Sequence, residues 1–101
     1  MVIWTQPAKD DLKAIYEYIA LDSKFYAKST AKNIVERIAR LSNTPNIGCV
    51  VPELEIDEIR EVFIYSYRII YQIIPDGLAV LTVVHGHRDL KSSDIPAIKV
   101  F

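Results

Sequence analysis

The sequence predicts a two-layer α+β domain in which a helical hairpin packs on one face of an antiparallel sheet, with elements in the order β-α-α-β-β-β. Residues 7–41 repeat apolar side chains at helical spacing, and residues 59–85 hold three β-rich segments separated by short turns. Each layer has an apolar face, so the two layers bury those faces against each other. The other face of the sheet should carry no helix, and function is expected there.

A short apolar strand is expected at Met1–Trp4, and the first helix should begin directly after it. In Thr5-Gln6-Pro7, either of the first two residues can cap the helix, and the proline suits the first turn because its missing N–H needs no partner there. Asp22-Ser23 offers a second N-cap, and a second apolar stripe follows it as far as Asn43-Thr44-Pro45. So short a link predicts two helices folded back on each other as a hairpin.

Three strands are predicted in the second half of the chain, at Ile59–Tyr65, Tyr67–Ile74 and Leu78–His85. Pro75-Asp76-Gly77 is a hairpin signal, so these strands should form an antiparallel meander. The last strand is almost entirely apolar, which predicts that it is covered on at least part of both faces. Residues 45–52 should form a loop and residues 89–101 a C-terminal tail. The whole chain, residues 1–101, is expected to be one domain with one core.

The composition argues against several classes of function. With 12 Lys+Arg against 13 Asp+Glu, the chain lacks the excess of cations that broad binding to nucleic acid requires. No apolar segment approaches the roughly 20 residues of a membrane span, and the first residues do not resemble a signal peptide, so a cytoplasmic location is expected. The single cysteine, Cys49, cannot form an internal disulfide and is interpreted as a small buried residue.

The segment VVHGHRDL at residues 83–90 raises the question of a metal site. In a strand, His85, His87 and Asp89 would project on the same side, and such a set suits zinc. A zinc site also needs further ligands held by neighbouring hydrogen bonds, and the chain contains no other histidine. The segment is therefore interpreted as the end of a strand. No metal, cofactor or small-molecule substrate is expected.

The remaining candidates are cationic side chains on the predicted strands or at their ends, namely Arg60, Arg68, Arg88, His85 and His87. A guanidinium group suits bidentate recognition of phosphate or carboxylate, and a histidine can act as an acid or a base near neutral pH. A structural alternative stays open. Arg60 and Arg68 could instead pair with Glu58, Glu61 or the acidic loop across the sheet.

With these elements placed, the sequence resembles the ParE/RelE superfamily of bacterial toxins over residues 2 to about 90. The resemblance rests on AKDDLKAIYEYIALDS in the first helix, VPELEIDEIREVFIYSYRIIYQI in the middle and VLTVVHGHR in the last strand. The combination of IRE, YRIIY and HGxR at these separations is fairly specific. The fold that it implies is the RelE/ParE-like arrangement of a helical hairpin on a sheet.

The resemblance implies the toxic half of a type II toxin-antitoxin pair, and two activities share this fold. The RelE branch cuts messenger RNA in the ribosomal A site with basic residues on the open face of the sheet, usually helped by a tyrosine or similar group in the C-terminal tail. The ParE branch poisons DNA gyrase and lacks that set. Because the fold alone cannot distinguish the two activities, the individual residues must.

Arg68 of YRIIY and Arg88 of HGHR match two arginines of the ribonuclease pattern. Arg60-Glu61-Val62 departs from it, because the ribonuclease branch has paired lysines there, and the tail after Arg88 contains no Tyr or His. The ParE-like activity is therefore favoured, as a gyrase poison that has no active site of its own. Its expected target contacts are Arg60, Arg68, His85, Arg88 and the apolar tail Ile95–Phe101. A ribonuclease would instead use Arg68, Arg88, His85 and His87.

Either activity implies a cognate antitoxin, a small dimeric DNA-binding protein whose disordered tail folds along this domain. The second partner would be DNA gyrase or, alternatively, the ribosome with its messenger RNA. The resemblance assigns no antitoxin-binding residues. A third alternative is an inactive remnant that only binds the antitoxin.

Overall fold

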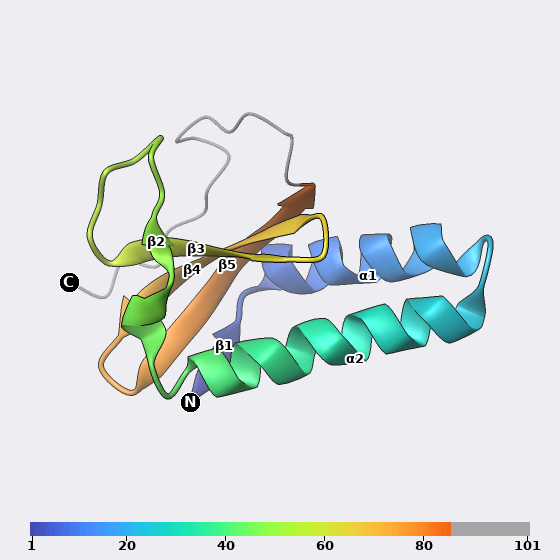
Figure 1. Ribbon diagram of the computed structural model, residues 1–101, viewed down its shortest axis with the longest axis horizontal. Coiled ribbons are helices and arrows are strands. Elements are labelled where there is room, and N and C mark those ends of the chain that lie inside the picture. The colour runs from blue at the N-terminus through green and yellow to red at the C-terminus, as the bar shows by residue number, and fades with distance from the viewer. Residues whose placement is uncertain (86–101) are drawn as a thin grey trace.

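The structure is a computed structural model that describes residues 1–85; the predicted tail, His87 and Arg88 lie outside the described residues. Two long helices extend beside a twisted sheet (Figure 1). The elements are β1 (Val2–Trp4), α1 (Gln6–Ala20), α2 (Lys24–Leu41), the 3-10 helix η1 (Pro45–Ile47), β2 (Cys49–Val50), β3 (Ile59–Ile64), β4 (Tyr67–Ile74) and β5 (Gly77–His85). The predicted helical hairpin and the three main strands are confirmed.

Both helices begin at the predicted caps. The hydroxyl oxygen of Thr5 accepts a hydrogen bond from the backbone N–H of Ala8 at 3.4 Å, and the hydroxyl oxygen of Ser23 accepts one from the N–H of Tyr26 at 3.2 Å. These bonds satisfy N–H groups that have no partner inside the helix. The Thr5 hydroxyl also donates to the carbonyl of Val80 at 2.7 Å. The first cap therefore joins α1 to β5.

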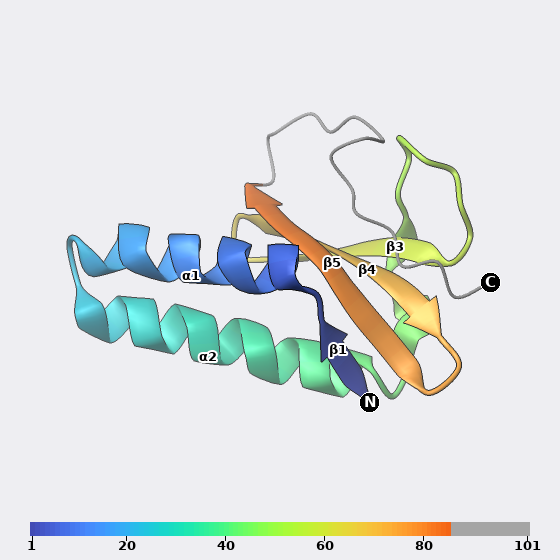
Figure 2. The same cartoon turned by 180° about the vertical axis from the view of Figure 1, so that it is seen from behind.

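The sheet has five strands in the order β1-β5-β4-β3-β2, and its pairing is mixed. The strands β2 to β5 pair antiparallel as predicted, but β1 pairs parallel with β5, with Val2 opposite Leu78 and Trp4 opposite Val80 (Figure 2). The prediction of a wholly antiparallel sheet is therefore wrong at this edge. The chain between β1 and β5 contains both helices and three other strands, so it is long enough for the crossover that parallel pairing requires. Strand β2 was predicted as loop, because two residues are too short to show an alternating pattern.

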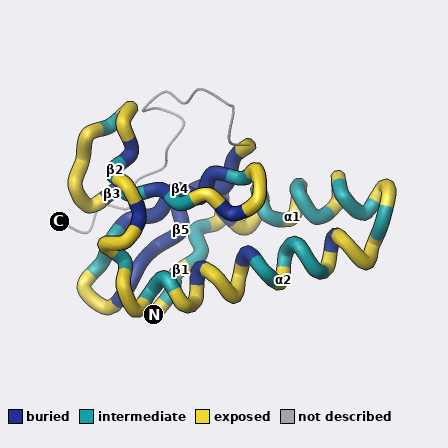
Figure 3. The backbone as a smooth tube through the Cα atoms, in the orientation of Figure 1, coloured by how far each residue is buried: buried dark blue, intermediate teal, exposed yellow. Residues whose placement is uncertain are grey.

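The core lies between the helices and one face of the sheet. Its larger cluster consists of Ala8, Ile34, Ile38, Ile64, Ile69, Tyr71, Leu78, Val80 and Val83. A second cluster lies on the opposite face and consists of Val51, Ile59, Ile70, Leu81 and Val84, with Leu54 packed against it. Strand β5 is buried on both faces up to Val84, as predicted (Figure 3). The second face is not bare, because Val51 and Leu54 from the loop at residues 51–58 pack on it.

Side chains and the N-terminal residue protect the outer edge of β5. Strand β1 ends opposite Val80, and beyond that point a carboxylate oxygen of Asp11 accepts hydrogen bonds from the N–H of Val83 at 2.9 Å and the hydroxyl of Thr82 at 2.7 Å. An open strand edge would otherwise offer these groups to another chain. At the start of the same strand, Gly77 has φ 147 and lies against Met1.

The structure bears on two predictions made from the composition, the burial of Cys49 and the lack of a membrane span. Cys49 is exposed on the edge strand β2, so the prediction that it is buried is wrong. Within the described residues, β2 is the outermost strand of the sheet and pairs only with β3. Among residues 1–85, no helix combines the length and the apolar character needed to cross a membrane.

Candidate functional site

Arg68 lies on the sheet face opposite the helices and is held by two carboxylates. Its Nη1 and Nη2 atoms donate to the two carboxylate oxygens of Glu53, both at 2.7 Å, and its Nε donates to Glu61. Glu61 comes from the neighbouring strand β3, and Glu53 from the loop at residues 51–58. Only 6% of Arg68 is exposed. Arg68 therefore pairs with Glu61 and the acidic loop, which is the alternative to a free binding residue that the sequence left open.

The charge of this cluster does not favour an anion. One guanidinium faces two carboxylates, and the bidentate pair with Glu53 uses the geometry in which an arginine would recognise a phosphate. The hydrogen bond to Glu53, and next to it the bond to Glu61, raise the pKa of Arg68 further above its ordinary value, while burial acts in the opposite direction. A phosphate could reach the fork of Arg68 only after displacing Glu53.

Arg60 is also fixed by internal contacts, but on the other face of the sheet. Its Nη2 donates to the carboxylate of Asp57 at 3.0 Å and its Nε to the backbone carbonyl of Asp57 at 2.8 Å. Its Nη1 donates to the carbonyl of Gly48 at 3.0 Å. Arg60 therefore pairs with Asp57 and not with Glu58 or Glu61. The side chain joins the segment around η1 to the start of β3.

The register explains why the two arginines do not share a surface. Arg60 is opposite Tyr71, whereas Arg68 is opposite Phe63. Directly opposed residues project on the same face, and residues three apart in a strand project on opposite faces. Tyr71 belongs to the core under the helices, so Arg60 lies on that side and Arg68 on the other. Arg60 therefore does not lie on the helix-free face, and the guanidinium groups of both arginines are engaged by partners within the chain.

His85 is the last residue of β5 and is exposed. Its ring meets the ring of Tyr67 edge-on, with centroids 6.2 Å apart, on the same side of the sheet as the helices. The two rings line a hollow of about 380 Å³ together with Ala14, Ile15 and Tyr18 of α1. The interpretation of His85 as a strand end is confirmed. Among residues 1–85, no group of His, Cys, Asp and Glu side chains could hold a metal ion.

Sequence reasoning did not single out two residues that the structure makes prominent. Glu53 was only one of several acids in the loop, and nothing local shows that its carboxylate reaches Arg68. Tyr18 is 75% exposed beside the hollow at His85. A signal for Tyr18 was present, because helical spacing places it off the apolar stripe of α1, where a large aromatic side chain is unusual.

The comparisons agree with this fold. A family model described as ParE toxin of type II toxin-antitoxin system, parDE, matches residues 2–90. Among solved structures, one described as the chromosomal ParDE TA system from P. aeruginosa superposes with a TM-score of 0.68 at 24% sequence identity, over 83% of this chain and 92% of that chain. No curated protein sequence is similar enough to count as a relative. The chain belongs to the ParE toxin family of type II toxin-antitoxin systems.

Proposed function

We propose that this ParE toxin inhibits DNA gyrase by protein-protein contact and has no active site of its own. The observation that supports this most strongly is the state of Arg68. A ribonuclease of the alternative branch would need this guanidinium to stabilise charge on the scissile phosphate. Here Glu53 and Glu61 already occupy all three of its donor nitrogens, and their negative charge would repel the phosphate.

The proposed contact surface lies where β5 ends beside α1. His85 and Tyr18 are exposed there and line one hollow, and Arg88 follows three residues after His85 in the sequence. Tyrosine and arginine are the side chains that most often dominate protein-protein contacts. Of the four single residues among the predicted target contacts, His85 and Arg88 are proposed as direct contacts. Arg60 and Arg68 would act indirectly, by fixing the sheet and its loops.

The proposal includes a cognate antitoxin that neutralises the toxin, and action in the cytoplasm, where gyrase and DNA are found. The family match and the likeness to a structure described as a ParDE system support a paired partner. A small dimeric DNA-binding protein with a tail that folds on binding remains the expected form of that partner.

The test is a supercoiling assay with purified gyrase and purified toxin, together with mapping of messenger RNA ends in cells that express the toxin. The proposal expects loss of supercoiling, accumulation of cleaved DNA on gyrase and intact messenger RNA ends. Codon-dependent cuts with unaltered supercoiling would replace it with the ribonuclease. Normal growth, normal supercoiling and intact RNA together would indicate the inactive remnant.

Two exposed aromatic residues test the contact surface. Tyr18→Ala should weaken gyrase inhibition about tenfold or more, because it removes an aromatic anchor beside His85. Phe63→Ala is the matched control, since Phe63 is 57% exposed but lies on the opposite face of the sheet. Inhibition should be unchanged in this control. Equal losses in both variants, with both proteins folded, would show that the surface is wrongly placed.

A further inference from the structure

The end of the helical hairpin exposes four large apolar side chains. Tyr18 is 75% exposed, Leu21 83%, Phe25 75% and Tyr26 65%. They lie within residues 18–26, here named the hairpin tip, which hold the end of α1, the turn and the first residues of α2. The rings of Phe25 and Tyr26 meet edge-on, with centroids 5.6 Å apart. Single exposed apolar residues are ordinary, whereas a group of them marks an interaction site.

The hairpin tip projects beyond the sheet, so the core cannot cover these side chains. Figures 1 and 2 both show the two helices running past the strands, with the turn between them at the far end of the hairpin. The buried residues of α2 are Ala27, Ile34 and Ile38, so the one nearest to the tip contributes a single methyl group. The large side chains of the tip are therefore exposed because of their position on the projecting hairpin.

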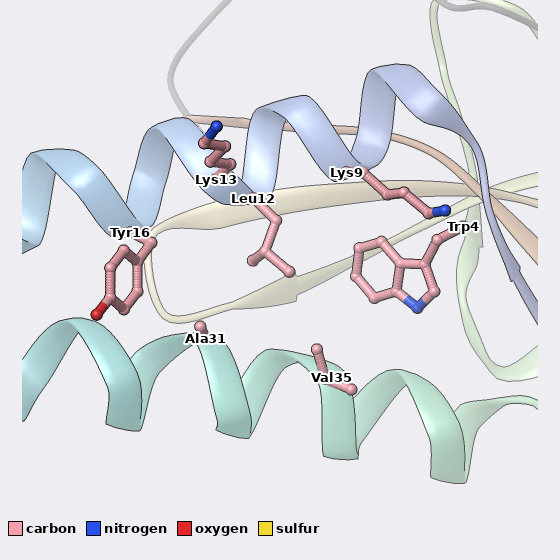
Figure 4. Close-up of a pocket in the computed structure, with 7 residues that line it drawn as sticks. All are labelled: Trp4, Lys9, Leu12, Lys13, Tyr16, Ala31 and Val35. Carbon is pink, nitrogen blue, oxygen red and sulfur yellow. The ribbon is translucent and has the colours of Figure 1, made fainter.

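Tyr18 joins the hairpin tip to the proposed contact surface. It lines the hollow of about 380 Å³ that also contains His85, and Leu21 follows three residues later, so Tyr18 and Leu21 are neighbours on one side of α1. The other side of α1 differs. Leu12 and Tyr16 are directed toward α2 and line a separate groove of about 490 Å³ (Figure 4). The tip therefore continues the surface at His85 and not the groove between the helices.

The charges beside the hairpin tip indicate what its occupant needs. Lys24 and Lys28 are exposed and lie about one helical turn apart at the start of α2. Neither lysine forms an ion pair with another of residues 1–85. Asp22 is the only acidic residue between Tyr18 and Lys28 in the sequence, so the tip has an excess of positive charge. An apolar depression with acidic groups at its margin would match this surface.

We propose that the hairpin tip inserts into an apolar depression of DNA gyrase, with Leu21 and Phe25 as the central contacts. The inference rests on the proposed function, because it extends the contact surface at His85 over the end of the hairpin. Aromatic side chains of this kind are enriched at the centre of protein-protein interfaces. A second copy of this chain, joined tip to tip, is a poorer occupant. Residues 18–26 alone are far fewer than the roughly 20–30 residues a side of a standard interface, whereas gyrase would cover the tip and the hollow at His85 together.

Two tip variants test the insertion in different ways. Phe25→Asp places a charge where an apolar contact is proposed, and it should not weaken the helix, because Phe25 is the second residue of α2 and a carboxylate there is favoured by the helix dipole. Leu21→Ala with Phe25→Ala removes both central side chains without adding charge. The matched control is Ile47→Ala with Phe63→Ala, which removes an aliphatic and an aromatic side chain, 71% and 57% exposed, from the surface beside β2.

The measurement is the toxin concentration that halves supercoiling by purified gyrase. This concentration should rise about tenfold or more for both tip variants and stay unchanged for the control pair. Circular dichroism and thermal unfolding establish that each variant folds. If the double alanine variant fails to fold, Phe25→Asp still decides the question. Equal losses of inhibition in the tip variants and the control pair would overturn the inference.

The outcomes separate this inference from the proposed function. If the wild-type toxin leaves supercoiling unaltered, the proposed function fails and the inference falls with it. If the wild-type toxin inhibits gyrase and the folded tip variants inhibit it equally well, only the inference is overturned. Sedimentation of the toxin, and its binding to vesicles of phosphatidylglycerol and phosphatidylethanolamine, identify the occupant in that case. A dimer or a membrane-bound form that only the tip variants lose would assign the tip to a second copy or to a lipid surface.

Discussion

At the scale of single residues, Arg68 and Glu61 form a buried ion pair, so removing one residue leaves the charge of the other buried without this partner. Arg68→Ala should lower the free energy of unfolding by about 3–5 kcal/mol, because it leaves the buried carboxylate of Glu61 without its main partner. The double variant Arg68→Met, Glu61→Leu should recover most of that loss, since apolar side chains can replace a buried pair. Urea unfolding measures both. Equal losses in the single and double variants would contradict the coupling.

Tyr71 gives a prediction for the dependence of stability on pH. Its hydroxyl donates to the carbonyl of Pro45 at 2.6 Å and accepts from the N–H of Gly48 at 3.0 Å. Burial of the phenol raises the pKa of Tyr71. The unfolded chain ionises this tyrosine near pH 10, before the folded chain does, so the contribution of Tyr71 is complete below about pH 10 and is lost as pH rises above it.

The matched comparison is Tyr71→Phe, measured by urea unfolding between about pH 8 and pH 11. At pH 8 the variant should be less stable by about 1–3 kcal/mol, because the buried N–H of Gly48 and the partly buried carbonyl of Pro45 lose their partner. The difference between wild type and variant should shrink above about pH 10, since only the wild type can ionise at this position. A difference that stays constant across this range would contradict the raised pKa.

At the scale of elements, the joint between β1 and β5 depends on a glycine. Gly77 has φ 147, and a Cβ atom there would lie 2.0 Å from the carbonyl oxygen of Met1. Gly77→Ala should therefore lower the free energy of unfolding by more than about 1 kcal/mol, through strain and displacement of β1. Asp76→Ala in the same turn is the control and should change little, because Asp76 contributes its backbone carbonyl to the N-terminus. Equal effects would refute this account of Gly77.

The elements that could be predicted are those with a local signal. Thr5 and Ser23 predict where the two helices begin, and the β-rich run at residues 67–74, which ends before a turn signal, gives β4 with the observed bounds. The parallel pairing of β1 has no local signal, because its partner lies about 75 residues away and any apolar strand could have taken the place. The two residues of β2 become a strand only because β3 is beside them.

At the scale of the whole molecule, the sequence could not predict which side chains share a face of the sheet, because that depends on the register of strand pairing. The sequence offered Glu61 and the acidic loop as partners for Arg68, which the structure bears out. The sequence did not show that Arg60 and Arg68 lie on opposite faces of the sheet. The predicted strand ended at Tyr65 instead of Ile64, so the register between β3 and β4 was not defined. A shift of one residue moves every side chain of a strand to the other face. Which cations share a surface therefore required the three-dimensional pairing.

Helix α1 lies between two hollows of the molecular surface. One side of this helix meets the hollow with His85 and Tyr67, and the other lines the groove against α2.

The central claim is that Arg68 stabilises the fold and takes no part in chemistry. The most direct measurement is gyrase inhibition by the purified double variant Arg68→Met, Glu61→Leu, after its fold has been verified by circular dichroism. Inhibition should match that of the wild-type toxin, because the target surface at His85 and Tyr18 is unchanged. A folded double variant that no longer inhibits gyrase would contradict the claim, and it would indicate that Arg68 takes part directly in inhibition.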